Sequence, residues 1–157
     1  MADNLYPTGY ESEIADISQL TPARPVGFRD GVLFNYETGD FPRDGRHRLR
    51  DSTGLVSWES WARNCLQTER FKHRCYSTDF GLELDKAFQA PTREAAESIL
   101  TRQIQEAMMA DPYGRTQYVE SIVFSWTAPD AVAVTVTLHG LEDVTIDVTA
   151  YITRGGI

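Results

Sequence analysis

The stretch that decides the fold is residues 66–84, which read LQTERFKHRCYSTDFGLEL. It starts at the end of a segment with helical spacing, passes through a basic segment and closes on Asp79-Phe80-Gly81. Apolar and charged side chains alternate over residues 71–76, which predicts a strand, and the Asp and Gly of the closing tripeptide predict a turn. The stretch shows no convincing nucleophile with its base, phosphate-binding loop or set of metal ligands, so we interpret it as a structural joint.

An amphipathic helix is predicted directly before this joint. Ser57 is a suitable N-cap residue. The apolar residues that follow recur at i, i+3, i+4, i+7 and i+8, which places them on one stripe; they are Trp58, Trp61, Ala62, Cys65 and Leu66.

Further upstream the sequence predicts a hairpin. Residues 32–36 and 46–50 have the character of short strands, with a turn at residues 37–40 between them. Arg46, Arg48 and Arg50 would share one face, because side chains alternate along a strand. Residues 1–30 show no sustained period and contain three prolines, which predicts an extended N-terminal arm.

Downstream of the joint, a second helix and three strands are predicted. Thr92 is the expected cap of a helix running to about Ala110, where Pro112 and Gly114 end it. The core-facing positions of that helix are Ala96, Ile99, Leu100, Ile104, Ala107 and Met108. Strand patterns follow at residues 118–126, 131–138 and 144–152, and the short turns between them favour an antiparallel meander.

These elements together predict an α+β fold in which two amphipathic helices pack on one face of the meander. The domain would span residues 31–157, with the N-terminal hairpin at its start and residues 1–30 as a separate arm. A chain of 157 residues with 41% hydrophobic and 24% charged residues has the composition of one ordinary globular domain.

The charge distribution favours protein partners over nucleic acid. The formal net charge is −8, yet residues 43–74 contain eight basic and four acidic side chains. The field of the whole molecule would repel phosphate, so the basic segment is expected to meet acidic protein surfaces. No apolar run approaches the roughly 20 residues that span a bilayer. Without a secretory signal pattern at its start, the chain is expected to stay in the cytoplasm where it is made.

Two groups of side chains suggest a metal site or a catalytic site, but a structural explanation is stronger for each. Cys65, His73 and Cys75 lack the short paired spacing of a zinc site, and Cys65 is better explained as a small core residue. Four carboxylates (Glu69, Asp79, Glu83 and Asp85) invite comparison with a glycosidase, but Arg70 and Arg74 lie nearby as counter-ions. We therefore expect no catalytic residue, metal or cofactor.

The last predicted strand contains a single charge and lies close to the C-terminus. Such a strand is expected at the edge of the sheet, where unpaired N–H and C=O groups can receive a partner strand. The alternative is an internal strand between two others. The residues assigned to this contact are Val144, Ile146, Val148, Ala150 and Ile152.

Three segments carry a family resemblance: the run from Phe34 to Asp40, the helix end Gln67-Thr68-Glu69-Arg70-Phe71, and the stretch from Tyr76 to Leu84. Over residues 32–152 the chain resembles the small baseplate proteins of contractile phage tails, the gpW/gp25-like sheath initiators of the baseplate wedge. This family has an acidic-Pro-Arg signature after its second helix. Here Asp111-Pro112 matches it, but Tyr113-Gly114 separates them from Arg115, so it is open whether Arg115 forms the family's ion pair.

The resemblance implies a structural protein of the tail baseplate, assembled in the host cytoplasm and without enzymatic activity. It would dock on the wedge core around the tail tube and start sheath polymerisation by strand pairing. Its implied partners are the tail sheath protein, baseplate wedge proteins and tail tube or hub proteins, in several copies forming a sixfold ring. The residues assigned to the fold or to wedge contacts are Glu69, Arg70, Tyr76, Asp79, Gly81, Asp111, Pro112 and Arg115.

Two other functions stay open from the sequence. One is a lysozyme-like hydrolase acting on peptidoglycan during injection, with Glu69 or Glu83 as the general acid. The other is a tail connector that never touches the sheath. Loss of peptidoglycan turnover in Glu69→Gln or Glu83→Gln would identify the hydrolase.

Overall fold

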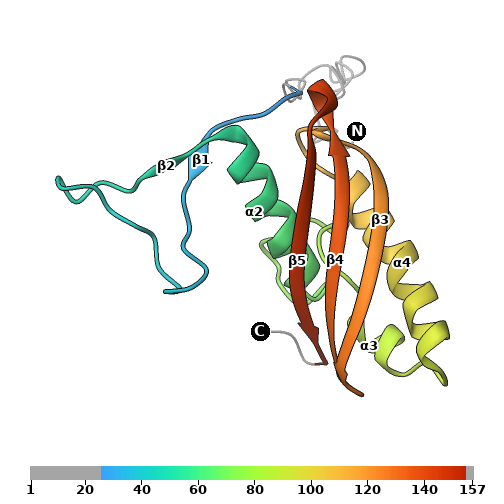
Figure 1. Ribbon diagram of the computed structural model, residues 1–157. Helices are drawn as coiled ribbons and strands as arrows, with labels where there is room; N and C mark the ends of the chain where they lie inside the picture. The colour runs from blue at the N-terminus through green and yellow to red at the C-terminus, as the bar shows by residue number, and fades with distance from the viewer. Residues whose placement is uncertain (1–25, 155–157) are drawn as a thin grey trace, which may run out of the picture.

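The structure is a computed structural model that describes residues 26–154. It confirms the α+β class: a three-stranded antiparallel sheet has its helices on one face, and a thin hairpin projects away from both (Figure 1). Residues 1–25, most of the predicted N-terminal arm, lie outside the described residues. The elements are β1 (Gly31–Val32), β2 (Asp51–Ser52), α2 (Gly54–Gln67), α3 (Leu84–Phe88), α4 (Arg93–Met109), β3 (Thr116–Ala128), β4 (Ala131–Gly140), a 3-10 turn (Leu141–Asp143) and β5 (Thr145–Thr153).

The meander is confirmed, in the order β3-β4-β5 with β4 in the centre. Alternate residues of β4 and β5 point into the core, as their sequence pattern predicts. The fully buried ones are Val132, Val134, Val136, Leu138, Val148, Ala150 and Ile152. The opposite face carries Thr-rich side chains that bond across strands, such as Thr137 to Asp147 at 2.7 Å.

Helices α2 and α4 form the second layer, with α2 against β5 and α4 against β3. The predicted stripe of α2 is confirmed for Trp58, Ala62, Cys65 and Leu66, which are fully buried, while Trp61 is partly buried. The predicted cap is wrong: α2 begins at Gly54 with Thr53 as N-cap, and Ser57 lies inside the first turn, where its hydroxyl bonds that of Ser52.

The second helix follows its prediction closely. Thr92 is the N-cap, and its side chain accepts a hydrogen bond from the Ala95 N–H. Five of the six predicted core positions are buried, and Ile99 packs against the core from its edge. The short helix α3 was not predicted; it is tied to α4 by Gln103, whose amide oxygen accepts from the Glu83 N–H at 2.9 Å.

The N-terminal hairpin exists, but its regular strands are shorter and lie elsewhere than predicted. Gly31 and Val32 pair with Ser52 and Asp51, and the Leu33 N–H donates to the Arg50 carbonyl. Beyond that base, two isolated bridges, Asn35 with Asp40 and Arg43 with Leu49, close smaller loops. Residues 46–50 are therefore not a strand, and their arginines do not line one face of a ladder. A segment this thin buries too little apolar surface to hold long regular strands.

The predicted strand at residues 71–76 is also wrong. The segment from Arg70 to Phe80 is a series of turns, and Phe71 adopts a positive φ of 69°. No neighbouring strand among the described residues offers this segment a ladder, so alternation alone does not make it a strand.

Candidate functional site

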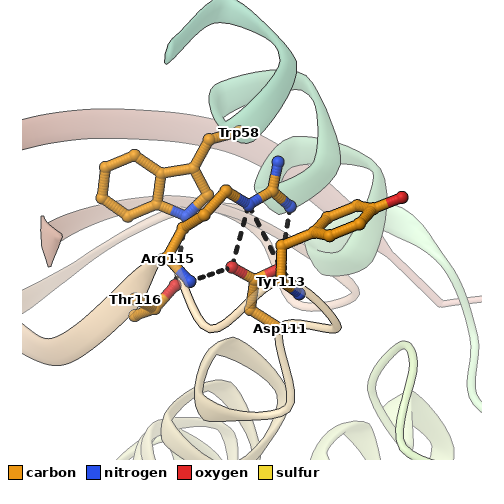
Figure 2. Close-up of polar contacts among 5 residues, drawn as sticks. All are labelled: Trp58, Asp111, Tyr113, Arg115 and Thr116. Carbon is orange, nitrogen blue, oxygen red and sulfur yellow. Dashed lines mark hydrogen bonds and ion pairs between the residues drawn. The ribbon is translucent and has the colours of Figure 1, made fainter. Parts of the chain in front are cut away.

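A buried ion pair joins the end of α4 to the start of β3 (Figure 2). The Arg115 guanidinium donates from Nη2 to Asp111 Oδ1 at 2.7 Å and from Nε to Asp111 Oδ2 at 2.9 Å. The side chains of Arg115 and Asp111 are only 3% and 1% exposed. The question left open by the sequence is therefore answered: Arg115 does form an ion pair with the acidic residue of the signature.

The two inserted residues form the turn that brings Arg115 back to Asp111. Gly114 has a positive φ of 58°, and its N–H donates to the Asp111 carbonyl, which turns the chain back on itself. The same Asp111 carboxylate accepts the backbone N–H of Arg115 at 2.7 Å. The guanidinium carbon lies 5.0 Å from the Tyr113 ring centre and 5.5 Å from that of Trp61. The carboxylate is thus satisfied by side-chain and backbone donors, as a buried charge requires.

The joint at residues 66–84 forms a closed loop. Backbone hydrogen bonds between residues 68–70 and Leu82 hold its two ends together, and we call this closure the neck. The Arg70 N–H donates to the Leu82 carbonyl, and the Leu82 N–H donates to the Thr68 carbonyl. The Arg70 side chain bonds the carbonyl of Gly81 at 2.9 Å, and that of Asp79 at 3.5 Å. The structure thus brings together three of the predicted residues, but Arg70 binds backbone carbonyls rather than the acidic side chains expected for it.

Gly81 is required at this neck for a steric reason. Its φ is +93°, and a Cβ there would lie 2.6 Å from the Thr68 carbonyl oxygen. Its N–H donates to the Cys65 thiol at 3.3 Å. The neck is therefore fastened directly to the buried face of α2.

A groove of about 690 Å³ lies between this loop, α2, the base of the hairpin and the end of α4. Three of the predicted residues, Tyr76, Asp79 and Pro112, line it together with Trp61. Tyr76 packs on Phe80, with ring centres 4.5 Å apart. The groove thus gathers side chains from the stretch Tyr76 to Leu84 and from the Asp111-Pro112 signature.

The carboxylates considered for hydrolysis have structural partners. Glu69 pairs with Lys72, and Glu83 pairs with Lys86, each three residues further on. Within residues 26–154, no group of three or more His, Cys, Asp or Glu side chains is placed to hold a metal ion. Each helix within residues 26–154 is too short or too polar to span a bilayer.

Strand β5 forms one edge of the sheet, since it pairs with β4 and with no other strand of the described chain. The side chains named from the sequence point inward: Val148, Ala150 and Ile152 are buried, and Val144 and Ile146 are partly buried against the core. The exposed side chains are those of the intervening residues, namely Thr145, Asp147, Thr149, Tyr151 and Thr153. Their polar character at every second position was the available signal.

The backbone N–H and C=O groups of β5 also alternate along the strand between facing β4 and facing the free edge. At one end the Val144 carbonyl accepts from the Gly140 N–H, and at the other the Arg154 N–H donates to the Asp130 carbonyl. The register between these bonds is unbroken. In an antiparallel ladder the residues that bond the neighbour alternate with residues whose N–H and C=O face away. The even-numbered residues therefore bond β4, and residues 145, 147, 149, 151 and 153 direct their N–H and C=O to the free edge.

The two cysteines are expected to differ strongly in reactivity. Burial raises the pKa of the Cys65 thiol to about 11, while the Gly81 N–H and Arg70 oppose the rise; Cys75 is exposed. At pH 8 a thiol reagent should modify one cysteine in the native protein and two after unfolding in urea, because the thiolate is the reactive form. Rapid native modification of both cysteines, counted by mass spectrometry, would contradict this placement.

The raised pKa of Cys65 also makes stability depend on pH. Since the pKa is higher in the folded state, the contribution of Cys65 to the free energy of unfolding is complete at neutral pH and is lost as pH rises toward 11.

The fold and site together define a small α+β domain with a buried acidic–arginine pair after its second helix and an unpaired sheet edge. The family model for the contractile injection system sheath initiator matches residues 31–143. The chain therefore belongs to the sheath initiator family of contractile injection systems, as its resemblance implied. A search of curated proteins found no match. The matched segment includes the ion pair and the joint but ends just before β5.

Proposed function

We infer how this chain performs the role that its family assigns to it, which is to initiate the sheath of a contractile tail. We propose, more specifically, that it docks in the baseplate around the tail tube and seeds the sheath by pairing the outer edge of β5 with an extended strand of the first sheath subunit. We infer a structural rather than a catalytic role, which the family description of a sheath initiator supports.

The observation that carries the proposal is the orientation of the β5 backbone. Five alternate residues face the free edge, which offers a partner strand up to five donors and five acceptors. Each hydrogen bond made contributes about 0.5–1.5 kcal/mol net, so several together anchor a subunit without a large apolar patch. The inward side chains hold β5 on the core, and its backbone remains available to the partner. Several copies around the tube would multiply these weak contacts.

Replacing Thr149 by Pro tests this pairing. The Thr149 N–H faces the free edge and makes no bond to β4, so Pro at this position should leave the sheet intact. It removes one donor and leaves a partner carbonyl unpaired, at a cost of about 1–3 kcal/mol, or roughly 5- to 150-fold in pairing affinity. We expect tails with far fewer sheaths, counted by electron microscopy of particles assembled with the variant.

Thr149→Ala is the matched control, because it removes the same hydroxyl but keeps the N–H, and it should assemble sheath normally. Circular dichroism and thermal unfolding establish that both variants fold. If Thr149→Pro does not fold, Tyr151→Pro repeats the test at the next outward N–H. Normal sheaths on a folded proline variant would reject strand pairing and favour a tail connector that does not touch the sheath.

A further inference from the structure

The tip of the N-terminal hairpin, residues 41–50, contributes no residue to the hydrophobic core. It projects away from the helices and the sheet (Figure 1), and all of its residues except Pro42 are exposed. The hairpin is fixed to the body through its base and through Tyr36, whose hydroxyl bonds the Ser60 carbonyl and the Asn64 side chain of α2. Fold stability therefore does not account for the composition of the tip.

That composition is strongly basic. The tip carries four arginines (Arg43, Arg46, Arg48 and Arg50) against one acidic residue, Asp44, in a chain of net charge −8. None of the four forms a salt bridge within residues 26–154. The Asp44 carboxylate is occupied by the backbone, because it accepts the N–H groups of Arg46 at 2.8 Å and Arg48 at 2.9 Å. Among the described residues, the positive charge of the tip is thus left without an acidic side-chain partner.

The tip also has a defined shape. The Asp44 N–H donates to the Arg48 carbonyl at 2.8 Å, the Arg50 N–H donates to the Pro42 carbonyl at 3.0 Å, and Arg43 bonds the His47 carbonyl. A turn held by this many bonds presents its arginines with little further loss of conformational freedom, which favours binding.

Apolar side chains lie beside the arginines. Phe41 and Leu49 are each 44% exposed, although the hairpin has no core of its own. Phe34 packs edge-on against Tyr36 and Phe41, with ring centres 4.9 and 5.0 Å apart. Arginine next to exposed aromatic and aliphatic groups is typical of the centre of a protein–protein interface.

We propose that residues 41–50 are a preformed docking element that binds an acidic protein surface of a neighbouring baseplate component. This inference rests on the proposed function for its setting, but it concerns attachment to the baseplate rather than the sheath. A protein partner fits better than nucleic acid, because the aromatic rings of Phe34, Tyr36 and Phe41 pack edge-on against one another instead of offering open faces for base stacking.

Charge reversal in the full-length chain tests the proposal. We expect Arg46→Glu with Arg48→Glu to lower the amount of chain recovered in purified baseplates by tenfold or more, measured by quantitative mass spectrometry. Arg46→Lys with Arg48→Lys keeps the charge and should be recovered at no less than a third of the wild-type amount. Arg102→Glu, a single charge reversal at an exposed arginine of α4, controls for charge reversal outside the tip and should incorporate normally. Wild-type recovery of the folded double-Glu variant would overturn the proposal.

A photo-crosslinking amino acid at position 46 identifies the surface contacted in assembled tails. Crosslinks to a peptide of another protein whose surroundings are rich in Asp and Glu would support the inference. Crosslinks to nucleic acid, to this chain alone or to no partner would overturn it. The readout is separate from that of Thr149→Pro, since a hairpin defect removes the chain from the baseplate whereas an edge defect leaves it there without a sheath.

Discussion

Replacing Arg115 by Met is expected to lower the free energy of unfolding by about 3–5 kcal/mol, because the substitution leaves a buried carboxylate without its counter-ion. The Asp111 side chain is 1% exposed, so water cannot replace the lost guanidinium. Arg115 also lies over the rings of Tyr113 and Trp61, and those contacts would be weakened. A typical domain is stable by about 5–15 kcal/mol, so the loss is a large part of the total. Urea unfolding followed by far-UV circular dichroism measures it.

The double variant Asp111→Asn with Arg115→Met separates charge from packing. It removes the stranded carboxylate while retaining an oxygen that can accept a backbone N–H, as Asp111 does from Arg115 and Tyr113. If the unpaired charge is the main cost, the double variant should recover at least 1 kcal/mol relative to Arg115→Met. Equal stability of the two variants would show that packing dominates. A loss below 1 kcal/mol in Arg115→Met would contradict the buried pair itself.

Replacing Trp58 by Ala is expected to cost about 3–5 kcal/mol, the usual range for removing a fully buried large aromatic side chain. Trp58 is fully buried between α2 and the sheet, packs on Phe28 and donates from its indole to the Thr116 hydroxyl at 3.1 Å. The ring also occupies the space above Gly140, where a Cβ would lie 2.5 Å from its edge. Thermal and urea unfolding of the purified variant test this.

Trp58→Phe is the matched control. It keeps most of the apolar area but removes the indole N–H and leaves the Thr116 hydroxyl unpaired, so we expect a smaller loss of about 1–3 kcal/mol.

Gly140→Ala should also destabilise the protein, and the loss of stability should be smaller in the Trp58→Ala background, where the space above Gly140 is open. Additive effects of these two substitutions would show that the predicted clash does not occur.

The elements predicted well from sequence are those whose hydrophobic pattern continues over many residues and whose apolar side chains pack in the common core. The second helix and the three strands each show a sustained period, and their apolar positions are the ones found buried. The errors fall on short segments. Residues 71–76 alternate but have no partner strand among the described residues, and residues 46–50 belong to a hairpin too thin for regular pairing.

The candidate site was predicted in part for similar reasons. Asp111 and Arg115 were identified through the family signature, but whether they meet depended on the turn at Tyr113-Gly114. Arg70 was expected to neutralise a carboxylate and instead bonds the carbonyls of the neck. Such partners depend on how the loop closes, which no local pattern specifies.

By itself the sequence determined the α+β class, the two amphipathic helices, the meander and the family, because hydrophobic periodicity and short motifs are local features of the sequence. Only the tertiary structure decided which backbone groups of β5 remain at the edge, since this depends on its pairing with β4. It also decided that the hairpin arginines have no internal counter-ions within residues 26–154. Charge pairing is a matter of distance in space, and the order of residues does not fix that distance.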